Sequence, residues 1–160
     1  MAEIGKRVGV AIDNSECSKK ALRWAIDNLL RKGDHLILVT VRGEHNYESA
    51  GEMQLWETTG SPLIPYNDFS NSATMKKYKV ETDAETLKLV DNAAKQKEIT
   101  PLMKIFWGDP REKLCEAVNN IPLTCLVMGN RGLGPLKRVI LGSVSNHVVN
   151  NASCPVTVVH

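Results

Sequence analysis

Short apolar runs alternate with amphipathic segments along this chain, and this alternation constrains the fold more than any other feature. The run "RVGVAI" at residues 7–12 is rich in β-branched residues and is typical of a buried strand. Apolar side chains then recur at helical spacing over residues 18–31. The run "HLILVTV" at residues 35–41 predicts a second strand. Strand, helix and strand in this order predict a right-handed parallel crossover.

The alternation continues through the second half of the chain. Further strands are expected at residues 102–107, 123–129 and 155–160, and further helices at residues 80–97, 108–120 and 143–152. The helix over "GDPREKLCEAVNN" has the clearest start, because Asp109 can cap it and Pro110 fits its first position. Together these elements predict an α/β fold, with helices on both faces of a parallel sheet.

The carboxyl ends of the expected strands indicate where a ligand would bind. In parallel sheets of this kind, ligands bind beyond those ends, where the strand order reverses. The ends are expected at Asp13, Val41, Trp107–Gly108 and Met128–Gly129. The glycine-rich stretch that begins at Gly129 therefore lies at the expected ligand edge.

Residues 42–79 interrupt the alternation. They are polar and contain several glycines and prolines, which predicts a long irregular connection with room for a short helix. Its aromatic residues, which include Trp56, Tyr66 and Phe69, could fold over a ligand as a lid or pack against the outer helices. We favour packing. The chain is otherwise expected to be one domain over residues 1–160, with this connection as an insert.

Composition excludes several classes of function. Hydrophobic residues make up 42% and charged residues 24% of the 160 residues, as in ordinary soluble domains. A formal net charge of +2 gives no electrostatic reason to expect nucleic acid or an anionic membrane as a partner. No apolar stretch reaches the ~18 residues of a membrane span, and "MAEIGKRVGV" has no targeting pattern. We therefore expect a cytoplasmic protein.

The cysteines give no sign of a metal site or of a disulfide framework. They stand at positions 17, 115, 125 and 154, with no Cys-x-x-Cys pair, and the four histidines do not cluster with them. Reduced thiols in a cytosolic protein are the expected state, and no metal ligands are predicted among the side chains.

The glycine-rich stretch has the spacing Gly129-x2-Gly132-x9-Gly142-Ser143. Backbone amides in a glycine-rich turn can bind an anion, and so can the free amides where the next helix begins, near Ser143. The Ser143 and Ser145 hydroxyls add donors, so the pattern suits a polyphosphate. The alternative is an ordinary turn followed by an ordinary helix start.

Asp13 follows the first strand and lies at the same edge. Its carboxylate could accept hydrogen bonds from ribose hydroxyls or an adenine amine, or it could serve a turn or a helix cap. Ser15 and Ser18 are more often helix caps than ligand contacts. The Walker phosphate loop, the Gly-x-Gly-x-x-Gly motif after the first strand and the Gly-x-Ser-x-Gly elbow are all absent from the sequence.

On these motifs the chain resembles the universal stress protein family, in its single-domain plant form and its ATP-binding branch. "VAIDNSE", "GDPREKL" and "CPVTVV" also resemble family stretches. The resemblance implies a Rossmann-like five-stranded parallel sheet in the order 3-2-1-4-5, similar to adenine nucleotide alpha hydrolases. It also implies a homodimer, and we expect the pairing strand to be Pro155 to Val159, an uncharged edge strand that no later element covers.

The resemblance implies a nucleotide site, assigned here position by position. Ala11, Ile12 and Asp13 would contact the adenosine end, and the backbone of Val41 would face adenine. The residues expected around the ribose and phosphates are Met128, Gly129, Arg131, Gly132, Gly142, Ser143, Val144 and Ser145.

The expected function is therefore that of a stress-response protein that binds ATP or AMP and acts as a dimeric switch or partner-binding module. Mg²⁺ could accompany the nucleotide through its phosphates. The alternatives are a slow ATP hydrolase and a chaperone-like dimer that works without nucleotide. Phosphoryl transfer needs a group that orients the nucleophile. Asp13 is the one acid placed at the ligand edge, and it is expected to contact adenosine, so no catalytic residue is predicted.

Overall fold

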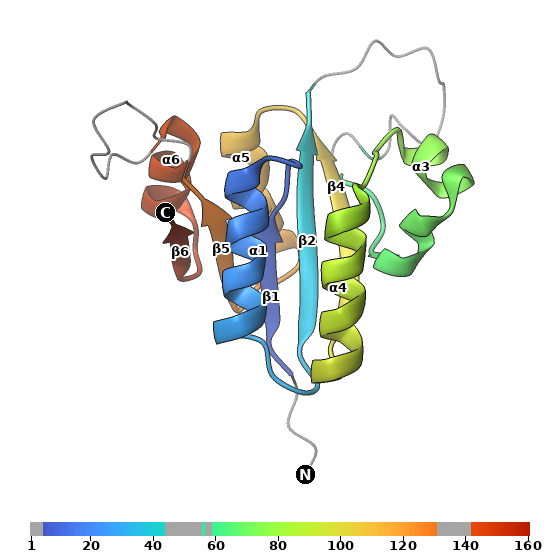
Figure 1. Ribbon diagram of the computed structural model, residues 1–160. Helices are drawn as coiled ribbons and strands as arrows, with labels where there is room; N and C mark the ends of the chain where they lie inside the picture. Colours follow the sequence, from blue (N-terminus) through green and yellow to red (C-terminus); the bar gives the residue numbers. More distant parts are fainter. Residues whose placement is uncertain (1–4, 44–55, 57–58, 131–141) are drawn as a thin grey trace.

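The computed structural model describes residues 5–43, 56, 59–130 and 142–160. They form one six-stranded sheet in the order β3-β4-β2-β1-β5-β6, with helices on both faces (Figure 1). The strands are β1 (Arg7–Ala11), β2 (His35–Arg42), β3 (Ile64–Pro65), β4 (Thr100–Trp107), β5 (Cys125–Gly129) and β6 (Val156–Val159). The helices are α1 (Glu16–Asn28), α3 (Ser72–Tyr78), α4 (Ala84–Lys97), α5 (Pro110–Asn120) and α6 (Ser143–Asn151), with a 3-10 helix η1 (Tyr66–Ser70).

The expected fold class is confirmed, with one correction to the strand count. The five expected strands are β1, β2, β4, β5 and β6, they pair in parallel, and their order matches 3-2-1-4-5. The sixth strand, β3, lies in the insert and pairs antiparallel with β4, Ile64 opposite Met103 and Pro65 opposite Leu102. Two residues are too few to show an alternating pattern, so the sequence could not predict this strand.

Each face of the sheet has its own apolar core. Alternate residues of β2 point to opposite faces, so Leu36 and Leu38 pack with α1 and α4, whereas Ile37 and Val39 pack with α5 and α6. Figure 1 shows α1 and α4 in front of the sheet and α5 behind it. This arrangement buries β2 on both faces, as its continuous apolar run predicts.

Side-chain caps set where the helices begin. The Ser15 hydroxyl accepts a hydrogen bond from the Ser18 N–H at 3.2 Å, so α1 begins at Glu16, two residues before the expected start. Asp83 caps α4 in the same way, at 2.8 Å from the Thr86 N–H, which moves its start from residue 80 to Ala84. For α5 the expected cap is confirmed, because Asp109 accepts from the Arg111 N–H at 2.9 Å.

Aromatic residues of the insert pack into the core on the α1 and α4 face. Tyr66 and Phe69 are buried there. Trp56 stacks on Tyr78 and Trp107, with ring centroids 5.2 Å and 6.2 Å apart. Whether the insert also forms a lid depends on residues 44–55 and 57–58, which lie outside the described residues.

Within the described ranges, no helix combines the length and apolar character that crossing a membrane requires.

Candidate functional site

A cavity of about 600 Å³ opens at the carboxyl ends of the central strands. In Figure 1 this is the upper edge of the sheet, where the arrowhead of β2 ends. The lining residues are Ala11, Ile12, Asp13, Ser15, Cys17, Ser18, Val39, Val41, Pro110, Leu114, Met128, Gly129, Gly142, Ser143, Val144 and Ser145.

The cavity gathers the residues that the sequence predicted as a site. Of the twelve predicted residues, Arg131 and Gly132 lie outside the described residues, and the other ten all line this cavity. They come from four separate segments: the end of β1, the end of β2, the end of β5 and the start of α6. The structure thus brings together residues that are far apart in sequence.

The cavity lies where the strand order reverses. From β1 the chain adds β2 and β4 on one side of the sheet and then β5 and β6 on the other, so the switch point falls between β1 and β5. The loops that leave β1 and β5 separate there and leave a crevice, which is the usual ligand position in such sheets. The topology therefore predicts a ligand site at this cavity independently of any motif.

The inner wall of the cavity is apolar and rigidly held. Val39, Val41 and Leu114 belong to the core between the sheet and α5. The Ile12 N–H donates to the Val39 carbonyl at 2.8 Å, and the buried Thr40 hydroxyl donates to the Ile12 carbonyl at 2.7 Å. These bonds hold the chain after β1 against β2, so this side of the cavity offers a fixed apolar surface to a ligand.

Asp13 organises the turn between β1 and α1 and also lines the cavity. Its Oδ1 accepts hydrogen bonds from the Ser15 N–H at 3.0 Å and from the Ser15 hydroxyl. Its own N–H donates to the Ser18 hydroxyl at 3.3 Å. The turn and the ligand interpretations of Asp13 are therefore compatible, because the turn fixes the position of an exposed carboxylate at the cavity.

Gly129 is required by packing. A Cβ atom there would lie 2.4 Å from the Cys17 carbonyl oxygen and 3.0 Å from the Cys17 Cβ. Only a residue without a side chain allows α1 to approach the end of β5 this closely. Packing alone therefore accounts for a glycine at position 129, without reference to a ligand. The same close approach places Cys17 in the cavity wall.

The start of α6 forms the polar end of the cavity. Gly142 is the N-cap, so the cap residue itself supplies no side-chain hydrogen bond to the first turn. The Gly142 N–H donates to Asn130 Oδ1 at 2.9 Å, and the Ser145 hydroxyl donates to the Gly129 carbonyl at 3.3 Å. The first amides of a helix have no partner within the helix, and the helix dipole favours an anion beside them. This end of the cavity therefore suits a negatively charged group.

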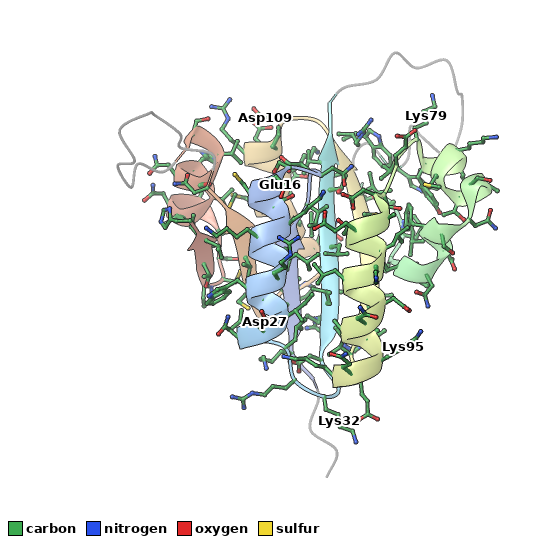
Figure 2. All side chains as sticks on the ribbon, viewed as in Figure 1. Glu16, Asp27, Lys32, Lys79, Lys95 and Asp109 are labelled. Carbon is green, nitrogen blue, oxygen red and sulfur yellow. The ribbon has the colours of Figure 1, made fainter. Side chains whose placement is uncertain are left out.

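Six lining residues were not predicted as site residues: Ser15, Cys17, Ser18, Val39, Pro110 and Leu114. Two signals could have found some of them. Val39 lies two residues before Val41 and so on the same face of β2. Pro110 begins the helix after β4, and helices that follow parallel strands begin at the ligand edge. Figure 2 accordingly shows Asp109 and Glu16 at the same end of the molecule.

Among the described residues that line the cavity, Asp13 carries the one ionisable carboxylate. No group of three or more histidine, cysteine or acidic residues in the described part of the chain could hold a metal ion. Apart from the Asp13 carboxylate and the Cys17 thiol, the described lining side chains are hydroxyl-bearing or apolar, and this lining suits binding and orientation of a ligand.

Comparison with known proteins decides the family. The model of the universal stress protein family matches residues 5–160. The chain belongs to the universal stress protein family. The Arabidopsis thaliana universal stress proteins PHOS32 and PHOS34 are 33% and 35% identical to it, and each alignment covers 96% of this chain. The chain spans 64% and 61% of the length of these two relatives.

Solved universal stress proteins share the fold. The protein UspA from Lactobacillus plantarum superposes with a TM-score of 0.63 at 18% identity, covering 99% of this chain and 100% of that one. A family protein from Arabidopsis thaliana with AMP bound superposes with a TM-score of 0.59 at 20% identity, and the match covers 96% of this chain and 90% of that one. A universal stress protein in complex with cAMP superposes with a TM-score of 0.58 at 20% identity, and the match covers 99% of this chain and 98% of that one. At these identities the likeness concerns the fold alone.

Proposed function

We propose that this universal stress protein binds an adenine nucleotide in the cavity between β1 and β5. The observation that carries the proposal is the convergence of ten predicted residues from four segments on that cavity. Two family structures that share the fold contain AMP or cAMP, which supports an adenine nucleotide as the ligand class. We infer ATP or AMP as the ligand of this chain.

The proposed pose follows from the polarity of the cavity. Adenine would pack beside the apolar wall at Val39 and Val41, where backbone groups at the end of β2 can meet its edge. Asp13 would accept a hydrogen bond from the ribose. The phosphates would lie at the start of α6, where the amides near Ser143 and the Ser143 hydroxyl can donate to them. Arg131 and Gly132 remain predicted contacts.

Mg²⁺ fits this site only as a companion of the nucleotide. Asp13 supplies the one carboxylate among the described lining residues and is proposed to face the ribose. The ion would therefore be coordinated largely by phosphate oxygens and water, which is common for Mg²⁺. It would neutralise phosphate charge, while the protein's own residues hold and orient the ligand.

We infer binding rather than turnover as the main activity. Hydrolysis requires a group that orients the attacking water, and the polar end of the cavity offers hydroxyls and amides in its described part. The proposed cellular role is a cytoplasmic stress-response switch that dimerises through β6 and presents its nucleotide state to a partner protein.

Calorimetry and a turnover assay test the proposal together. Titration of nucleotide-free protein with ATP, ADP and AMP should show saturable binding with one site per chain, whereas GTP should bind more weakly. Phosphate release from bound ATP should stay near the rate of a buffer control. Absence of adenine nucleotide binding by the folded protein would contradict the proposal, and rapid phosphate release would replace it with an enzyme.

A further inference from the structure

A second cavity, of about 470 Å³, lies at the same edge of the sheet. We call it the basic cavity, and its lining residues are Asn14, Arg42, Met75, Lys76, Lys79 and Glu81. They come from the loop after β1, the end of β2, and α3 with the connection that follows it. In Figure 2 Lys79 lies near α3, at the same end of the molecule as Asp109 and Glu16.

The basic cavity has an excess of positive charge that the described part of the chain does not neutralise. Arg42, Lys76 and Lys79 face one acid, Glu81, so the formal charge of the lining is three minus one, or +2. None of these four side chains forms an ion pair with another described residue, whereas Lys6, Lys19 and Lys95 all do.

The dipole of α3 explains only part of this charge. Lysines near the carboxyl end of a helix are favourable because the last carbonyls carry partial negative charge, which accounts for Lys76. The α3 dipole does not account for Arg42, because Arg42 ends β2 and is not part of α3. Asn14 ties the loop after β1 to the connection that follows α3, because its Nδ2 donates to the Glu81 carbonyl at 3.2 Å.

We propose that the basic cavity binds a small phosphate monoester, separately from the nucleotide site. Its volume is within the range of small-molecule sites and exceeds what a bare phosphate ion fills. A phosphate monoester is close to a dianion at neutral pH and matches the charge of the lining. Arginine presents a planar fork of donors to phosphate, and lysines add point charges. Met75 offers an apolar surface for the carbon part of the ligand.

The basic cavity borders the cavity between β1 and β5, which we call the nucleotide cavity. The two cavities share no lining residue. Asn14 follows Asp13, and Arg42 follows Val41, so each pair of neighbours contributes one residue to each cavity. The polar end of the nucleotide cavity at Ser143 belongs to other elements, α6 and β5. The proposal stands on the charge of the basic cavity and does not depend on nucleotide binding.

An amide NMR titration with glycerol 3-phosphate tests the proposal, with glycerol and inorganic phosphate as comparisons. We expect saturable shifts at Asn14, Gly43 and the residues from Lys76 to Glu81, absent with glycerol. Tighter binding of glycerol 3-phosphate than of inorganic phosphate would support a monoester ligand. Equal affinity would support the same anion site with free phosphate as its ligand.

Removing a positive or a negative charge from the basic cavity should change its affinity for glycerol 3-phosphate in opposite directions. Lys76→Gln should weaken binding about threefold, as expected for one exposed charge contact, and Glu81→Gln should strengthen it. The matched control is Lys77→Gln, from the same helix, because the Lys77 ammonium lies 5.5 Å from the Tyr78 ring centroid and does not line the cavity. Equal affinities of the Lys76 and Lys77 variants would overturn the proposal.

The Gly142→Val variant separates the two sites. It alters the start of α6 and leaves every residue of the basic cavity in place, so the shifts at Lys76 to Glu81 should persist. If phosphate shifts occur only near residues 142–145 and vanish in this variant, phosphate binds in the nucleotide cavity and the basic cavity is not a site.

Discussion

At the start of α6, Gly142 has φ −62° and ψ 163°, a conformation that any residue adopts. The backbone therefore does not require a glycine, and the proposed reason for it is access of phosphate oxygens to the helix amides. Gly142→Val should place a branched side chain at those amides and weaken ATP at least about tenfold, or about 1.4 kcal/mol. Calorimetry of the folded variant measures this loss.

Gly43→Val is the matched control for Gly142→Val. Among the described residues other than its chain neighbours, a Cβ at Gly43 would meet no atom within 4 Å, and Gly43 does not line the cavity between β1 and β5. ATP affinity should stay at the parental value in this control. Parental affinity in the Gly142 variant as well would show that phosphates do not lie at the start of α6.

Asp13 gives a prediction about the adenosine end of the site. Asp13→Ala should weaken ATP, ADP and AMP by a similar factor, because adenosine is common to all three, with a loss of about 1.5–3 kcal/mol for a hydrogen bond to a charged acceptor. Asp13→Asn keeps an oxygen that can accept from the Ser15 N–H, so it controls for loss of the turn. A calorimetric loss confined to ATP would instead place Asp13 near the terminal phosphate or its metal.

The buried side chain of Asp34 ties the residue before β1 to the loop between α1 and β2. It accepts hydrogen bonds from the Lys6 N–H and the Arg31 N–H, both at 2.9 Å, and pairs with Lys6 Nζ at 2.9 Å. Burial alone would raise the pKa of this carboxyl, but the hydrogen bonds from Lys6 and Arg31 outweigh it and lower the pKa below its ordinary 3.8. Asp34 therefore stabilises the folded state most when it is ionised.

The sign of the pH dependence follows from this lowered pKa. The stabilisation by Asp34 is complete above pH 3.8 and is lost as the pH falls through the lower, folded-state pKa. Asp34→Asn should cost about 1–3 kcal/mol of unfolding free energy at pH 7. Urea unfolding of parent and variant across pH measures the difference, which should shrink in acid. A difference that stays constant down to the lowest accessible pH would contradict this account.

At the scale of elements, the contact between α1 and β5 depends on Gly129. A methyl group at that position would overlap the backbone of Cys17, which cannot move without shifting α1. Gly129→Ala should therefore lower the unfolding free energy by about 1–3 kcal/mol, as for other overpacked sites. Thermal and urea unfolding measure it, with Gly142→Ala as a control that should change stability little, because its backbone conformation is ordinary.

The elements that the sequence predicted well are those with long, consistent patterns. The buried strand β2 and the helix α5 could be located from an apolar run and from a cap with a proline behind it. The start of α1 was misplaced because Ser15 and Ser18 are both good capping residues, and only the structure shows that Ser15 is the cap. The strand β3 was missed because its pairing with β4 depends on contacts distant in sequence.

The candidate site was predictable to the extent that it follows from strand ends and from a motif. Asp13 and Val41 end neighbouring strands, so their meeting at one cavity follows from the topology. The packing role of Gly129 was not predictable, because it depends on how closely α1 approaches β5. The basic cavity was not predictable either, since Arg42 and Lys79 are distant in sequence and line one cavity only in the folded chain.

At the scale of the whole molecule, β6 is an edge strand of the described sheet, and this edge carries the dimer prediction. The carbonyls of Pro155 and Val159 accept hydrogen bonds from the Leu126 and Asn130 N–H groups. The backbone N–H and carbonyl groups of residues 157 and 159, and the carbonyl of Pro155, therefore point toward β5. The backbone groups of Val156 and Val158 point away from it. All four β6 residues are half-buried and uncharged, so nothing in the strand discourages pairing.

Two copies can satisfy these outward groups by pairing β6 with β6 about a two-fold axis, which closes the assembly without forming a fibre. Val156→Pro should disrupt the dimer selectively, because it removes an outward N–H and leaves the ladder to β5 intact, and proline is tolerated at such edges. Val156→Thr keeps the N–H and the β-branched shape and should remain dimeric. Light scattering after size exclusion at micromolar concentration should give twice 17.7 kDa for parent and Thr variant, and 17.7 kDa for the Pro variant. A monomeric parent would contradict the prediction, and a dimeric, folded Pro variant would move the interface away from β6.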